Sequence, residues 1–126
     1  MAALILDSGA LIAIERGNRR VGALLERAAR ERVEVWTCAT CVAQVWRDPA
    51  RQARLTRALA GVVEHSLDPS RARRIGRLLA GTGTSDVVDG AVVSLGRDGD
   101  AVVTSDAVDL RRLGASAGVE IRVLAV

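Results

Sequence analysis

The 126-residue sequence contains no Phe, Tyr or Lys, and its only aromatic residues are Trp36 and Trp46. Stacking of nucleobases on aromatic side chains is therefore not expected as a mode of nucleic-acid binding. All 18 basic residues are Arg, against 15 acidic residues, so the net charge is +3. A small positive excess is compatible with nucleic acid as a partner but does not require it.

Long apolar runs are also absent, and Cys and His are scarce. No segment approaches the ~18 consecutive apolar residues of a membrane span, and "AALIL" near the N-terminus lacks a signal-peptide pattern. We therefore expect a cytoplasmic protein without membrane association. Cys38 and Cys41 in "CATC" have redox-motif spacing, but His65 is the single His, so a zinc site would be incomplete. Small buried residues are the preferred interpretation of the two Cys, and a disulfide switch is the alternative.

Short apolar runs alternate with longer segments of helical periodicity. Strands are predicted at residues 2–6, 33–37, 62–67, 101–105 and 119–126. Helices are predicted at residues 8–16, 20–32, 39–47, 49–60, 69–80, 86–97 and 107–117. This alternation predicts one domain, residues 1–126, folded as a three-layer α/β/α sandwich with a mainly parallel central sheet.

Gly and Pro residues mark the expected ends and beginnings of these helices. Helices are predicted to end at Gly17, Gly61, Gly81, Gly99 and Gly118, and to begin at Pro49 and Pro69.

Two phrases nearly repeat each other: "TSDVVDG" at residues 84–90 and "TSDAVDL" at residues 104–110. Each sets two Asp residues three apart beside an apolar segment. In one interpretation the Asp side chains cap the helices that follow, because carboxylates there accept unpaired amide hydrogens. In the other, the phrases belong to one acidic site, and the two phrases alone do not decide between these interpretations.

The predicted topology favours a shared site. Asp7 follows the first strand and Asp106 follows the fourth, and the carboxyl ends of parallel strands meet at one edge of a sheet. Asp86 and Asp89 open a helix nearby. Crowded carboxylates repel each other unless a cation is present, and oxygen ligands suit Mg²⁺ or Mn²⁺. Such ions support phosphodiester hydrolysis.

Four phrases, in this order, resemble the PIN-domain family: "LILDSGALIAIE", "CVAQVWRDPARQARL", "SDVVDGAVVSLG" and "AVVTSDAVDLRRL". They span nearly the whole chain, whose compact size is similar to that of VapC toxins of bacterial toxin–antitoxin pairs. The resemblance implies a PIN-like fold and a Mg²⁺- or Mn²⁺-dependent endoribonuclease. It also implies RNA as substrate, a cognate antitoxin as partner and a homodimer.

The family pattern has acids after the first strand, on the third helix and in the two later phrases. By resemblance, the catalytic and metal-binding residues are Asp7, Asp89 and Asp106, with Asp86 as an assisting ligand or a cap. Residues expected beside the site are Ser8, Gln44, Thr104 and Asp109.

Gln44 is the departure from this pattern, because it stands in "VAQVWR" where the family has Glu. A Gln offers a carbonyl oxygen to a metal but brings no charge and cannot act as a base. The alternative function is therefore a catalytically weak or inactive PIN-like module that binds RNA or antitoxin.

Two groups of Arg complete the candidates. The first comprises Arg47, Arg51, Arg54 and Arg57, which recur at helical spacing and are expected on one helical face if Pro49 does not bend the path far. Arg73, Arg74 and Arg77 form a second cluster. The first group is interpreted as a contact surface for RNA phosphates or for the antitoxin. An ordinary solvated face is the alternative.

Overall fold

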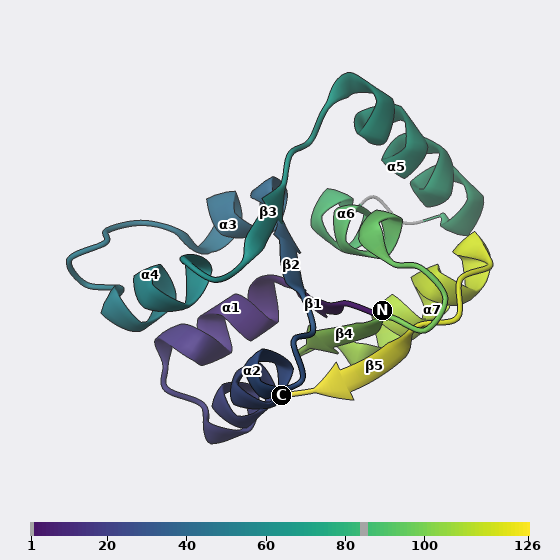
Figure 1. Ribbon diagram of the computed structural model, residues 1–126. Helices are drawn as coiled ribbons and strands as arrows, with labels where there is room; N and C mark the ends of the chain where they lie inside the picture. The colour runs from purple at the N-terminus through teal and green to yellow at the C-terminus, as the bar shows by residue number, and fades with distance from the viewer. Residues whose placement is uncertain (1, 84–85) are drawn as a thin grey trace.

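The computed structural model describes residues 2–83 and 86–126. These residues form a five-stranded sheet and the helices that cover it (Figure 1). The strands are β1 (Leu4–Leu6), β2 (Val35–Cys38), β3 (Val63–His65), β4 (Ala101–Thr104) and β5 (Arg122–Ala125). Their order is β3-β2-β1-β4-β5, and all neighbours are parallel. The central strands β1 and β4 are buried along their whole length, as the apolar runs "LIL" and "AVVT" require.

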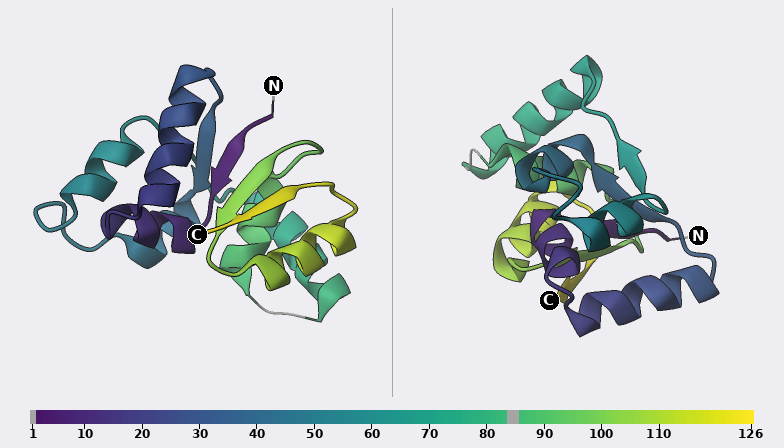
Figure 2. Two further views of the ribbon diagram at one scale, coloured as in Figure 1. Left: turned by 90° about the horizontal axis from the view of Figure 1, so that it is seen from below. Right: turned by 90° about the vertical axis from the view of Figure 1, so that its left-hand side faces the viewer.

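Helices cover both faces of this sheet. The described residues form α1 (Ser8–Glu15), α2 (Arg19–Arg30), α3 (Ala39–Val45), α4 (Ala53–Leu59), α5 (Pro69–Thr82), α6 (Val87–Leu95) and α7 (Ala107–Ala117). The left view of Figure 2 shows α1 to α4 on one side of the sheet and α5 to α7 on the other. The predicted three-layer α/β/α sandwich is confirmed. Within the described residues, no helix is long and apolar enough to cross a membrane.

Most of the predicted glycine and proline boundaries are confirmed. Gly17, Gly61 and Gly118 lie within two residues of a helix end, and Pro69 is the first residue of α5. Gly81 also lies within the last turn of α5, which ends at Thr82 and is capped by the left-handed Gly83 with φ +72°. One glycine prediction is wrong. Helix α6 ends at Leu95, so Gly99 lies in the following loop.

Pro49 does not begin a helix, which corrects a further prediction. Asp48 Oδ1 accepts the N–H of Ala50 at 3.0 Å, and this contact closes a turn. The buried Gln52 side chain accepts the N–H of Arg47 at 2.8 Å, which holds the loop in place. Helix α4 therefore begins only at Ala53.

The predicted arginine face is also wrong, because two of its members precede α4. Arg47 Nη1 donates to the Ala43 carbonyl at 3.2 Å, and Arg51 Nε lies 3.9 Å from Asp48 Oδ2. Arg54, on α4, donates to the Glu15 carbonyl at 3.4 Å. These side chains therefore do not form one helical stripe. Contact of Arg47, Arg51 and Arg54 with RNA or antitoxin stays a prediction.

The strand order determines where a crevice can form. From β1 the chain proceeds outward through β2 to β3, then returns to place β4 on the other side of β1. The connections after β1 and β4 therefore diverge, and ligands of open α/β sheets bind at such a switch point. Asp7 directly follows β1, and Asp106 follows β4 after one intervening residue, Ser105.

Candidate metal centre

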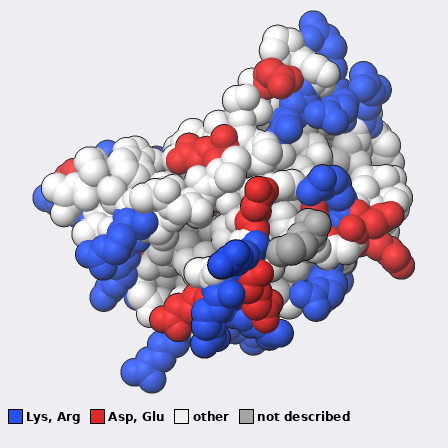
Figure 3. Space-filling view, in the orientation of Figure 1, with Lys and Arg blue, Asp and Glu red and all other residues white. Residues whose placement is uncertain are grey.

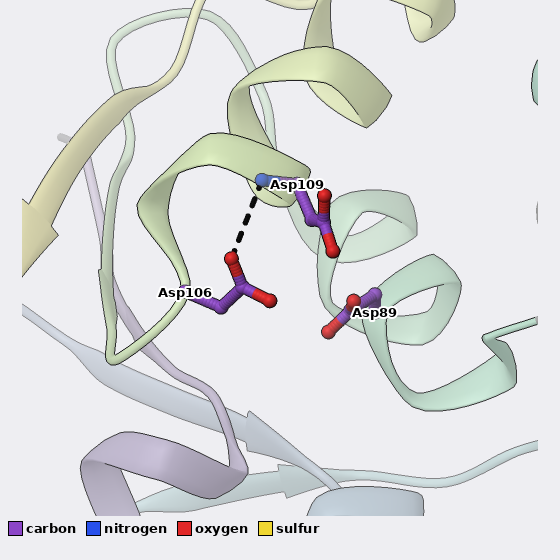
Figure 4. A group of neighbouring side chains, drawn as sticks. All are labelled: Asp89, Asp106 and Asp109. Atoms are coloured by element: carbon purple, nitrogen blue, oxygen red, sulfur yellow. Dashed lines mark hydrogen bonds between the residues drawn. The ribbon is translucent and has the colours of Figure 1, made fainter.

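Three carboxylates converge above the carboxyl end of β4. Asp89 on α6, Asp106 at the start of α7 and Asp109 on α7 each offer an oxygen, and these oxygens lie within 4.8 Å of one another. Figure 4 shows the three side chains directed toward a common space between the two helices. Asp89 and Asp106 were predicted ligands, whereas Asp109 was expected only beside the site.

The same acids also cap helices. Asp7 Oδ1 accepts the N–H of Ala10 at 2.8 Å, and Asp86 Oδ1 accepts the N–H of Asp89 at 3.0 Å. Asp106 Oδ1 lies 3.5 Å from the N–H of Asp109. Capping and clustering are therefore compatible, because the amino ends of α1, α6 and α7 gather at one edge of the sheet. The repeated "TSD" phrases fit both interpretations, although Thr84 and Ser85 lie outside the described residues.

Asp7 is buried beside the cluster and is linked to it through Thr104. The carboxylate of Asp7 accepts a hydrogen bond from the Thr104 side chain. The Thr104 hydroxyl oxygen in turn accepts the N–H of Asp106 at 2.8 Å. Thr104 is fully buried, so this hydroxyl fixes the ends of the two central strands relative to each other. Asp7 is nevertheless not one of the three acids whose oxygens meet within 4.8 Å.

The electrostatics of the site reflect crowding of like charges. Burial, followed by the negative charges of Asp86, Asp7, Asp106 and Asp109, raises the pKa of Asp89 to about 6. Burial also raises the pKa of Asp7, and the charge of Asp106 adds to this shift, although three hydrogen bonds oppose it. Ionising all the acids is therefore unfavourable without a neutralising cation.

Two glycines allow the elements that hold these acids to approach each other closely. A Cβ on Gly9 would collide with the side chain of Ser105, so Gly9 lets the start of α1 lie against the loop that follows β4. A Cβ on Gly90 would lie 2.9 Å from Ile75 and 3.1 Å from Leu79, where α5 packs on α6. These glycines follow Asp7 and Asp89 closely in the sequence, so close packing and acid placement depend on the same short phrases.

A cavity of about 450 Å³ opens beside the cluster. It is lined by Thr82, Gly83, Asp86, Asp89, Asp109, Arg112 and Leu113. Arg112 was not among the predicted site residues. Its position three residues after Asp109 on α7 was the available signal, since residues three apart share a helical face.

Gln44 lies next to the start of α1. Its Oε1 accepts a hydrogen bond from Ser8 Oγ at 2.5 Å, and its side chain is exposed. Ser8 directly follows Asp7, which is a predicted metal ligand. Gln44, which stands where the resemblance implies a Glu, is therefore linked by one hydrogen bond to the neighbour of that ligand. The carboxamide oxygen is thus already used by a protein donor.

The donor set fits a hard divalent cation. Asp89, Asp106 and Asp109 offer only carboxylate oxygens at mutual distances that one ion can span, and Asp7 adds a buried carboxylate nearby. Mg²⁺ and Mn²⁺ prefer such oxygen donors and commonly keep some water ligands. A cation would also relieve the repulsion that raises the pKa of Asp89.

Solved structures with the same fold come from toxin–antitoxin complexes. A chain of VapBC2 from Rickettsia felis, bound to a DNA fragment from their promoter, has TM-score 0.71 and 12% identity, and the match covers 96% of this chain and 98% of that chain. A chain of DNA-bound VapBC from Salmonella typhimurium has TM-score 0.65 and 16% identity, with 98% of each chain covered. No protein-family model and no curated protein matches the sequence. At these identities the similarity is one of fold, and the chain has the PIN-like α/β fold of these VapBC structures.

Proposed function

We propose that the protein is a metal-dependent endoribonuclease that acts as the toxin of a type II toxin–antitoxin pair. The observation that carries this proposal is the convergence of Asp89, Asp106 and Asp109 beside Asp7, at the switch point of a PIN-like sheet. The fold shared with VapBC chains supports the toxin assignment, and the acidic oxygens support the hydrolytic one.

In this function, Asp89, Asp106 and Asp109 would hold Mg²⁺ or Mn²⁺, with Asp7 as a further ligand, directly or through water. When bound, such a cation supplies Lewis-acid polarisation of a phosphodiester and makes water more acidic. Thr104 orients Asp7 by donating a hydrogen bond to its carboxylate. Asp86 serves α6 as a cap through the N–H of Asp89, and its carboxylate also lines the cavity.

RNA would be held by its phosphates, because the chain has too few aromatic residues for base stacking. Arg73, Arg74 and Arg77 lie exposed on α5, and Figure 3 shows basic side chains gathered over that helix. Helix α5 packs on α6, which carries Asp89. A phosphate backbone on this surface would therefore adjoin the acidic site.

The partners in this proposal are a cognate antitoxin and a second copy of the chain. The matched structures are VapBC assemblies, which supports an antitoxin partner for this chain as well. A homodimer follows from the family resemblance alone, and the oligomeric state is measured by light scattering.

A second candidate function is binding without cleavage, and Gln44 favours it. The carboxamide cannot take a proton from water, and its oxygen accepts the Ser8 hydroxyl. Such a module would bind RNA or antitoxin through the same crevice.

One experiment separates the two functions. The purified protein is incubated with a pool of structured RNAs in Mg²⁺, in Mn²⁺ and in chelator, and the products are mapped by sequencing. We expect discrete internal cuts that require the cation and disappear in Asp89→Asn. RNA binding without cuts in either cation would reject the nuclease and favour the binding module.

A further inference from the structure

A pair of buried thiols lies at the junction of β2 and α3. The Sγ atoms of Cys38 and Cys41 are 3.0 Å apart, and the two side chains are 3% and 0% exposed. Thr40 Oγ1 donates to Cys38 Sγ at 3.3 Å. A disulfide requires sulfurs about 2.05 Å apart, so a small side-chain adjustment would join them.

An unneutralised cation lies beside these thiols. Nε and Nη1 of Arg71, in the first turn of α5, are buried without a hydrogen-bond partner among the described residues. The positive charge of Arg71 acts on both Cys38 and His65, which are paired neighbours on β2 and β3. Arg71 as a whole is half-buried, but burial of two guanidinium nitrogens without a partner is costly, and a thiolate at Cys38 would supply an opposite charge.

The protonation of the pair is asymmetric. The hydrogen bond from the Cys41 thiol lowers the pKa of Cys38 to about 6, with smaller contributions from Thr40 and Arg71. The same hydrogen bond raises the pKa of Cys41. Thr40 donates to the Cys38 sulfur and the charge of Arg71 favours a thiolate there, so we assign Cys38 as the nucleophile of the pair and Cys41 as the resolving thiol.

We propose that Cys38 and Cys41 form a redox-active dithiol that is oxidised to an intramolecular disulfide by hydrogen peroxide, with Arg71 as the positioning cation for the Cys38 thiolate. Cys38 sulfur attacks one peroxide oxygen, the O–O bond breaks, and hydroxide leaves as Cys38 becomes a sulfenic acid. Cys41 then gives up its proton, and its sulfur attacks Cys38 sulfur. The S–O bond breaks and the departing hydroxide is protonated. The dithiol loses two electrons, and the peroxide is reduced to water.

The disulfide would form next to the candidate metal centre. The Ser8 side chain, which donates to Gln44, also interacts with Cys41, and Asp7 acts electrostatically on that thiol. Oxidation removes the Cys41 thiol from this network. The redox chemistry itself does not depend on the proposed nuclease activity, so its test needs no RNA.

The test treats the metal-free protein, residues 1–126, with hydrogen peroxide and then alkylates the remaining thiols. Intact mass spectrometry should show loss of two hydrogen atoms per chain and no alkylation, and a reducing agent should restore both thiols. The chain should stay monomeric on a non-reducing denaturing gel. Cys41→Ser should instead accumulate a sulfenic acid at Cys38 that dimedone traps. Failure to form the intramolecular bond would overturn the proposal.

The role of Arg71 is tested by titrating the thiolate absorbance in the ultraviolet. Cys38 in the parent should titrate near pH 6, and Arg71→Gln should titrate at a higher pH because one charge that favours the thiolate is removed. Arg73→Gln is the matched control, because Arg73 lies on the same helix but donates to the Pro69 carbonyl and is exposed. Circular dichroism checks that each variant is folded. An equal titration of the Arg71 and Arg73 variants would remove Arg71 from the proposal.

Discussion

Asp100 and Asp89 lie at opposite ends of the same sheet and have opposite surroundings. Asp100 precedes β4 and is 1% exposed, and its two oxygens accept the N–H of Ala3 at 2.7 Å and of Arg97 at 2.9 Å. The Arg97 guanidinium lies 3.8 Å from it. Asp89, in contrast, faces other carboxylates, and burial and their charges raise its pKa to about 6.

The groups around each carboxylate distinguish a structural acid from an acid of the candidate site. Both carboxylates are removed from water to some degree, and burial alone does not separate them. Asp100 is surrounded by donors and holds the loop before β4 to the start of β1. Asp89 lies among other carboxylates, and the cation that we propose would neutralise their repulsion.

The largest expected effect is the loss of RNA cleavage in Asp89→Asn. The substitution preserves shape and removes the charge of a proposed ligand, and we expect activity to fall by at least about a hundredfold, since even outer-shell partners of a metal contribute about 10–100-fold. Asp100→Asn should keep its activity per folded molecule. Initial rates with a single RNA substrate in Mn²⁺ measure both variants, and equal losses would erase the distinction between the two acids.

A second prediction concerns the stability of Asp100→Asn. The new amide group can accept only one of the two N–H donors and directs its own N–H groups at the other. The free energy of unfolding should fall by about 1–3 kcal/mol, the penalty for a buried unsatisfied polar group. Urea unfolding followed by circular dichroism measures it. An unchanged midpoint would show that the two backbone contacts contribute little.

Asp89→Asn should instead stabilise the metal-free protein at neutral pH. The folded-state pKa of about 6 exceeds the unfolded value near 3.8, so the folded protein binds more protons between these values. Stability of the parent therefore decreases as pH rises through this window, and the penalty is complete above it. Asn cannot ionise and avoids the penalty, which we place at about 1 kcal/mol after screening of a half-exposed group.

Thermal melts in chelator measure this effect. At pH 7 the variant should melt roughly 3–6 °C higher than the parent, and the difference should vanish near pH 4. A variant that melts lower at pH 7 would mean that Asp89 is held by donors, like Asp100.

Gln44→Glu should have a smaller effect, since the side chain is exposed and keeps an acceptor for Ser8. The added charge should tighten Mn²⁺ binding by on the order of 1 kcal/mol and lower the melting temperature slightly in chelator. Melts of both proteins with and without Mn²⁺ measure the two effects. An identical Mn²⁺ response would place position 44 outside the reach of the ion.

The smallest effects are expected among the arginines, which also divide into one that contacts protein groups and others that are exposed. Arg97 lies over the Trp36 ring at 4.8 Å and beside Asp100, whereas Arg74 and Arg77 are exposed on α5. Arg74→Gln and Arg77→Gln should each reduce the salt slope of RNA binding by about one, and Arg97→Gln should not change it. Fluorescence anisotropy across salt concentrations measures these slopes. Equal slopes in all three variants would show that RNA does not follow α5.

The sequence predicted the architecture because hydrophobic periodicity and strand alternation are local signals. It also placed Asp7, Asp89 and Asp106 near one edge, since parallel strands end together. It could not predict that Asp109, and not Asp7, joins Asp89 and Asp106 in the cluster, because that depends on how α6 and α7 are placed relative to each other. The arginine stripe was wrong for a nonlocal reason: the buried Gln52 holds the loop that delays α4 to Ala53. The relation of Arg71 to Cys38 depends on where the first turn of α5 lies relative to β2, which no short pattern shows.

The most direct test of the central claim is calorimetric titration of Mn²⁺ into the metal-free parent, Asp89→Asn and Asp100→Asn at neutral pH. The account predicts saturable binding to the parent, at least about tenfold weaker binding to Asp89→Asn, and parental affinity in the folded Asp100→Asn protein. Equal affinity for the parent and Asp89→Asn, or no saturable binding to the parent, would contradict a divalent-cation site at the carboxyl edge of the sheet.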